Sequence, residues 1–114
     1  MINIKLYFKD ENLFQFKISG HADYARSGSD IVCAGVSVLA LNTINSIETF
    51  LEEPMYINEK DEKKGILDCT FPNIKRGLCK PEVMILLKSM SYGLEELQKN
   101  YPKNISVKKY ALRR

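Results

Sequence analysis

The spacing of the hydrophobic residues changes between residues 20 and 30, and this change limits the folds open to the chain. Before it, apolar and polar side chains alternate on both sides of a polar turn at residues 9–12. A period of two is typical of strands with one buried face, so the segment predicts a β-hairpin. The second strand stops at Ser19 and Gly20. The alternating apolar positions are Ile2, Ile4, Leu6 and Phe8, followed by Phe14, Phe16 and Ile18.

From residue 30 onward the apolar residues recur at helical spacing. They predict an α-helix that ends before Pro54. Asp30 or Ser29 can cap this helix by accepting hydrogen bonds from its first backbone N–H groups. Cys33 would then lie in the first turn, in line with the apolar stripe. That stripe consists of Val36, Ala40, Ile44, Ile47 and Leu51.

The second half of the chain repeats the order of strands and helix. Residues 55–59 and 66–71 predict a second hairpin around a charged turn at residues 60–65. A loop covers residues 72–80. Pro81 is well placed to open a helix, and Pro102 ends it. The helix stripe is Val83, Leu87, Met90, Leu94, Leu97 and Tyr101.

Ile105 and Val107 suggest a last strand, followed by a basic tail that contains Lys108, Lys109, Arg113 and Arg114. The element order is therefore ββαββαβ. Hairpins dominate this order, which favours an α+β fold with two helices packed on a mostly antiparallel sheet. A length of 114 residues is typical of one domain, and we expect residues 1–114 to form it.

Composition narrows the cellular setting. The net charge of +3 permits an anionic neighbour without requiring one. Three cysteines without a CxxC motif argue against a disulfide framework and favour a reducing compartment. A helix needs about 20 apolar residues to cross a bilayer, and we expect no apolar run of nearly that length in this chain. The N-terminus does not resemble a signal peptide. These features predict a cytoplasmic protein with no membrane partner and no required nucleic acid.

His21 and Cys33 could form a nucleophile and base pair. A thiolate is favoured near a helix N-terminus, where unpaired N–H groups can also hold an oxyanion. His21 is the only histidine, and the flexible loop at residues 22–29 could bring its ring over the helix start. It could then take the thiol proton and return it to the leaving amine. Asp30 could orient His21 or could only cap the helix.

Other interpretations of these residues remain open. A lone cysteine on an apolar stripe is usually a core residue, and a lone histidine after a strand usually lies on the surface. Cys69 and Cys79 are interpreted as structural. A zinc site would need about four ligands, and a redox dithiol would need a second nearby cysteine. The competing class of function is a non-catalytic binding module that docks on the ribosome or on RNA.

The stretch GHADYARSGSDIVCAGVS closely resembles the core motif of the bacterial ribosomal-processing cysteine protease family, Prp. The matching positions are Gly20, His21, Ala22, Gly28, Asp30, Ile31, Val32, Cys33, Ala34, Val36 and Ser37. The resemblance implies a cysteine endopeptidase with Cys33 as nucleophile, His21 as base and Asp30 in support. It implies no cofactor and no metal. It further implies a homodimer whose substrate is the precursor of large-subunit ribosomal protein twenty-seven, cleaved after paired phenylalanines.

Overall fold

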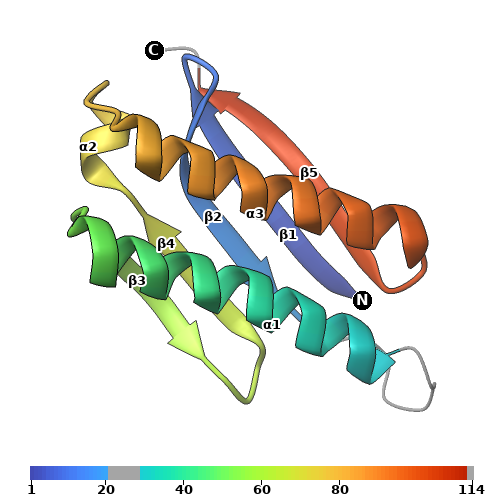
Figure 1. Cartoon of the computed structure of the whole chain (residues 1–114). Coiled ribbons are helices and arrows are strands. Elements are labelled where there is room, and N and C mark those ends of the chain that lie inside the picture. The colour runs from blue at the N-terminus through green and yellow to red at the C-terminus, as the bar shows by residue number, and fades with distance from the viewer. Residues whose placement is uncertain (21–28, 113–114) are drawn as a thin grey trace.

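The computed structural model describes residues 1–20 and 29–112, with residues 29 and 30 described only by their backbone. Two long helices lie over one face of a five-stranded sheet (Figure 1). The expected order ββαββαβ and the α+β class are both confirmed. The strands are β1 (Ile2–Lys9), β2 (Asn12–Ser19), β3 (Tyr56–Asp61), β4 (Ile66–Thr70) and β5 (Ile105–Leu112). The helices are α1 (Ser29–Ser46), η1 (Ile47–Leu51), α2 (Pro72–Lys75) and α3 (Pro81–Asn100).

The strands lie in the order β3-β4-β2-β1-β5. The pairs β1–β2, β2–β4 and β3–β4 are antiparallel, whereas β5 runs parallel to β1. Phe16 illustrates how the sheet is built, because it pairs with Leu6 on β1 and with Cys69 on β4, and all three side chains are fully buried. The period-two pattern therefore points one face of the three central strands at the helices.

The two long helices pack closely on each other as well as on the sheet. A Cβ atom placed on Gly35 of α1 would lie 3.3 Å from Leu97 of α3, and one placed on Gly93 of α3 would lie 3.0 Å from Leu39 of α1. Each helix thus presents a glycine to a leucine of the other. Between helices and sheet lies one hydrophobic core, which includes Ile4, Leu6, Phe16, Val36, Ile47, Phe71, Leu87 and Leu94.

Helix α1 begins slightly earlier than expected, and its continuation η1 ends before Pro54, as expected. It begins at Ser29, so Asp30 is already helical, and Cys33 is the fifth helical residue rather than a residue of the first turn. At the other end the regular helix stops at Ser46 and continues as the wider turn of η1, which closes at Glu52 with a left-handed φ of 51°. The wider turn keeps Ile47 fully buried while Phe50 points into solvent.

Two expectations for the second half are corrected. Residues 72–80 are not wholly a loop, because Pro72 opens the short helix α2 and its Ile74 is buried. The basic tail is largely a strand, because Lys108 and Lys109 belong to β5, which runs as far as Leu112. The parallel pairing with β1 extends the strand beyond its apolar start. Arg113 and Arg114 lie outside the described residues.

The expectation about membrane-spanning length was wrong. In the described part of the chain, the helical stretch Ile31–Leu51 has 21 residues and a mean hydropathy of 1.5, which is long and apolar enough to cross a membrane by composition alone. Core helices of soluble domains share these properties. Here the stripe of Val36, Ala40, Ile44 and Ile47 is buried against the rest of the domain.

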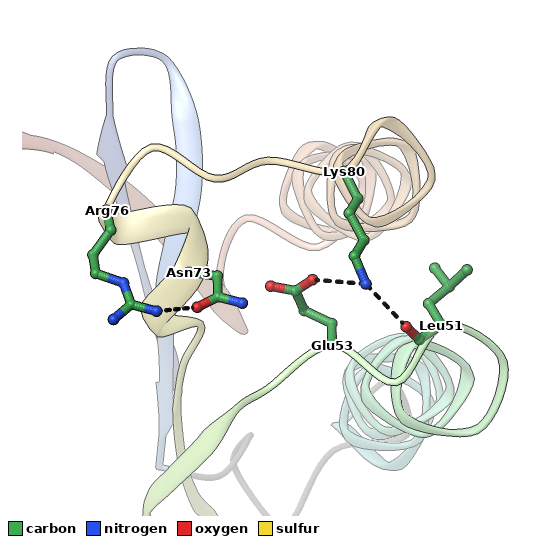
Figure 2. A network of polar contacts seen from close by, with 5 residues as sticks. All are labelled: Leu51, Glu53, Asn73, Arg76 and Lys80. Carbon is green, nitrogen blue, oxygen red and sulfur yellow. Dashed lines mark hydrogen bonds and ion pairs between the residues drawn. The ribbon is translucent and has the colours of Figure 1, made fainter.

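An ion pair between an exposed lysine and a buried carboxylate links the end of η1 to the start of α3 (Figure 2). The Glu53 side chain is only 1% exposed, and its Oε1 lies 3.9 Å from Nζ of Lys80. The same ammonium donates a hydrogen bond to the Leu51 carbonyl at 3.4 Å. Neither carboxylate oxygen of Glu53 accepts a hydrogen bond from a described residue. Because a buried carboxylate is costly without a partner, Lys80 is what makes this connection tolerable.

Gly20 closes β2 in a conformation that favours glycine, with φ at 89°, and a Cβ there would lie 2.5 Å from the Met1 carbonyl oxygen. Gly77 has nearly the same φ, 90°, but has open space around it. We expect Gly77→Ala to lower the free energy of unfolding by ~1–2 kcal/mol, the usual strain of a left-handed residue. Gly20→Ala should lose at least ~1 kcal/mol more, because the backbone must also move. Urea unfolding measures both, and equal losses would show that the contact with Met1 is not tight.

Candidate active site

A cavity opens beside Cys33 at the end of the sheet where β2 stops and α1 begins. Its volume is about 330 Å³, within the range of pockets that bind small groups. One wall comes from α1, the floor comes from β1, β2 and β4, and the far wall is the turn between β3 and β4. Its lining residues are Ile2, Ile18, Gly20, Cys33, Val36, Ser37, Ala40, Leu41, Lys60, Asp61, Glu62, Gly65, Ile66 and Leu67.

The first turns of α1 bring Cys33 to this cavity. Cys33 is half buried and packs against the edge of the core, and Ser37, one turn later, also lines the cavity. Val36 and Ala40 line it too, although both are almost fully buried. The thiol is therefore held by a helix that is anchored in the core by Val36 and Ala40, next to the cavity. A nucleophile in such a place meets a substrate in a defined position.

The floor of the cavity is apolar and its rim is charged. Ile18, Ile66 and Leu67 come from strand ends. Asp61 is the last residue of β3, and Glu62 follows it in the β3–β4 turn. That turn is braced by a hydrogen bond from the Lys64 backbone N–H to the Asp61 carboxylate at 3.1 Å. The arrangement suits a bound peptide with an apolar side chain on the cavity floor and polar backbone groups at the rim.

The other two cysteines are placed differently. Cys69 on β4 is fully buried, and this burial, with a smaller contribution from the charge of Asp68, raises the pKa of its thiol to about 12. Cys79 is half buried in the connection before α3. Cys69 thus points into the core and Cys79 lies in a loop, as the sequence predicted. All three cysteines are free thiols.

The side chains of two of the three predicted site residues, His21 and Asp30, are not among those that the structure describes. His21 lies outside the described residues, and of Asp30 only the helical backbone is described. Gly20, the residue before His21 in the chain, lines the same cavity as Cys33. The helix start at Ser29 leaves Asp30 within the helix rather than in the capping position before it.

Sequence reasoning missed the far wall of the cavity. The sequence indicates only an ordinary charged turn at Lys60, Asp61 and Glu62. Nothing local in the sequence connects this turn with Cys33. They reach it because β4 pairs with β2, a contact between distant segments. A pattern of charges in a hairpin turn carries no signal of what the turn will face.

Comparison with known proteins identifies the family to which the chain belongs. A family model for the cysteine protease Prp matches residues 1–106. The ribosomal processing cysteine protease Prp of Bacillus subtilis (strain 168) is 27% identical over 99 residues, covering 86% of this chain and 87% of that protein. The protein of the same description from Staphylococcus aureus (strain NCTC 8325 / PS 47) is 28% identical over 106 residues, covering 92% and 95%.

Solved structures give the same picture. The essential ribosomal processing protease Prp from S. aureus, in complex with a substrate peptide, superposes with a TM-score of 0.82 at 26% identity, covering 96% of this chain and all of that one. SMU.848 from Streptococcus mutans superposes with a TM-score of 0.86 at 24% identity, covering 98% and 96%, and shares the fold. Since the family model extends from the first residue through residue 106, this chain belongs to the cysteine protease Prp family and is a cysteine protease.

Proposed function

We propose that this protein is an endopeptidase that removes the short N-terminal extension of large-subunit ribosomal protein twenty-seven. The observation that carries the proposal is the place of Cys33, half buried on helix α1 at the wall of a cavity with an apolar floor. Support also comes from two relatives: the B. subtilis protein is described as a ribosomal processing protease, and the S. aureus protein of that kind has been solved with a substrate peptide.

In this proposal Cys33 is the nucleophile and His21 is the general base. The Cys33 sulfur attacks the scissile carbonyl carbon while His21 takes the thiol proton. As the tetrahedral intermediate collapses, the C–N bond breaks and His21 gives that proton to the leaving amine. Water then attacks the thioester, passes a proton through His21 to the departing sulfur, and releases the new carboxyl terminus. Asp30 is proposed to support His21 by orienting its ring.

The apolar floor of the cavity is the proposed subsite for one of the paired phenylalanines. The ring of that phenylalanine would lie against Ile18, Ile66 and side chains of α1. Burial of one such ring stabilises a complex by roughly 1.5–3 kcal/mol. The residue after the scissile bond is alanine in this proposal, so the leaving side needs little room.

We further propose that the enzyme acts as a homodimer in the cytoplasm. Three free cysteines suit a reducing compartment. Light scattering coupled to gel filtration tests the dimer, since a mass of one chain at working concentration would contradict it. Localisation of a tagged protein tests the compartment. The alternative of a non-catalytic module is not supported, because the chain is a cysteine protease by family.

Replacement of the nucleophile is the first test. Cys33→Ala should abolish cleavage of a precursor peptide, with the fold intact, since it removes the sulfur and little volume. Cys79→Ala is the matched control, because Cys79 is also half buried but lies in a loop. It should keep the activity. Turnover by a clean Cys33→Ala preparation, followed by mass spectrometry of the products, would refute the proposed nucleophile.

Alkylation should rank the three thiols. With limiting iodoacetamide in the native protein, Cys33 should react first, because it faces a cavity. Cys69 should react last, because it is buried and its raised pKa of about 12 leaves almost no thiolate near neutral pH. Peptide mass spectrometry reports the order, and in denaturant all three should react alike. Early labelling of Cys69 in the folded protein would contradict the packing of β4.

The general base gives a separate prediction. His21→Ala should lower kcat/KM by ~100-fold or more, and the wild-type rate should depend on pH through a histidine-like group. A stopped assay over a pH series measures both effects. If the rate changes only a few fold, another group takes the proton.

Filling the cavity should impair cleavage selectively. Ser37 is exposed and lines the cavity, whereas Asn42 is exposed on the same helix and does not. Ser37→Leu should lower kcat/KM for a paired-phenylalanine peptide by roughly 10-fold or more, and Asn42→Leu should not. Replacing either phenylalanine by alanine should weaken cleavage by wild-type enzyme to a similar extent. Peptides cleaved equally well with and without the aromatic pair would refute the substrate while leaving Cys33 as nucleophile.

A further inference from the structure

The sheet face opposite the helices carries a row of lysines. Both long helices lie on one side of the sheet, and no described element covers the other side (Figure 1). On this open face Lys5 of β1 stands directly opposite Lys17 of β2 and beside Lys108 of β5. Neighbouring strands are about 4.8 Å apart, so the three lysines form a row roughly 10 Å long.

The register fixes which way these lysines point. Ile4 and Leu6, on either side of Lys5, are buried in the core under the helices. Because alternate side chains of a strand point to opposite faces, Lys5 points away from the core. Lys109, the next residue after Lys108, confirms the alternation on β5. It reaches the helix side and forms an ion pair with Glu95 of α3 at 2.6 Å.

Within the described residues, none of the three lysines forms an ion pair. The ion pairs among the described residues that were found on lysines involve Lys80, Lys99 and Lys109. Like charges directly opposite one another on a sheet destabilise it. The fold therefore keeps a repulsive row of charge on its surface, and binding of an anion with several charges would relieve it.

Two tyrosines complete the open face. Tyr7 lies two residues beyond Lys5, and it pairs in register with Tyr110, two residues beyond Lys108. Their rings stack with centroids 5.3 Å apart and planes inclined by 21°. Tyr110 is 41% exposed, so the stacked pair presents an aromatic surface next to the lysines. Lysines beside exposed aromatic rings are the combination that binds single-stranded nucleic acid, through phosphates and stacked bases.

Acidic groups limit the patch on one side. In the register, Lys17 stands opposite Asp68 of β4, and Asp68 stands opposite Glu59 of β3. Asp68 accepts hydrogen bonds from Gln15 at 3.0 Å and from Asn58 at 3.2 Å. The face is thus acidic over β3 and β4 and basic over β2, β1 and β5. A polyanion would lie over β1 and β5.

We propose that this basic face, made of Lys5, Lys17, Lys108, Tyr7 and Tyr110, binds single-stranded RNA. The lysine ammonium groups contact phosphates and the tyrosine pair stacks on a base. An anionic lipid surface would satisfy the lysines but offers no base to stack, which is why the tyrosines favour RNA. The inference does not rest on the proposed substrate or on Cys33. Cys33 belongs to α1, and α1 lies on the opposite side of the sheet from the basic face.

Fluorescence anisotropy with a labelled single-stranded RNA of about ten nucleotides tests the proposal. The full chain should bind it, with affinity that falls as salt rises. Lys5→Gln with Lys108→Gln should weaken binding roughly 10-fold and reduce the salt slope by about 1.4, because each phosphate contact contributes about 0.7. Tyr110→Leu should weaken binding roughly fivefold or more without changing the slope.

The matched control removes two charges elsewhere. Lys88 and Lys99 are exposed on α3, in the helix layer, and Lys88→Gln with Lys99→Gln lowers the net charge equally. It should leave RNA binding within about twofold of wild type, because neither lysine belongs to the basic face. Circular dichroism and urea unfolding check that every variant is folded. Three results would overturn the proposal: no RNA binding by the wild type, equal loss in the control, or binding to phosphatidylglycerol vesicles but not to RNA.

Discussion

The packing of α1 on the sheet is the contact on which the candidate active site depends. Val36 and Ala40 are almost fully buried in the core, yet both also line the cavity beside Cys33. The helix cannot shift along the sheet without breaking this packing, because close-packed interiors resist such movement. The core therefore sets the position of Cys33, and the cavity is the place where the core reaches the end of the sheet.

The hydrophobic pattern was sufficient to predict the elements and their order. Period-two alternation located β1 and β2, and proline at residue 81 marked the start of α3. Details governed by distant contacts were not predictable. The strand β5 runs past its apolar residues because β1 offers it a parallel partner, so Lys108 joins a sheet rather than a tail. The expectation that no apolar stretch reaches membrane-spanning length failed for a different reason. A core helix can also be apolar on its exposed side, as Val38 and Leu41 of α1 show.

The candidate site likewise has one part that could be predicted from the sequence and one part that could not. Cys33 could be singled out from sequence because it lies near the start of an apolar helix and belongs to a specific motif. The cavity could not, since its far wall comes from the β3–β4 turn and depends on the pairing of β4 with β2. The roles proposed for His21 and Asp30 rest on the motif alone. The two-layer fold also presents two separate candidate binding surfaces, the cavity beside Cys33 and the open face of the sheet.

The most direct test of the account is covalent capture of the nucleophile. A peptide chloromethyl ketone that ends in two phenylalanines places an electrophilic carbon where the scissile carbonyl would lie, and the attacking sulfur displaces chloride. Digestion and mass spectrometry then locate the adduct. The account predicts one adduct per chain, on Cys33, that forms more slowly when a substrate peptide competes. Labelling of Cys79 instead, or the absence of any adduct on an enzyme that still cleaves its substrate, would contradict it.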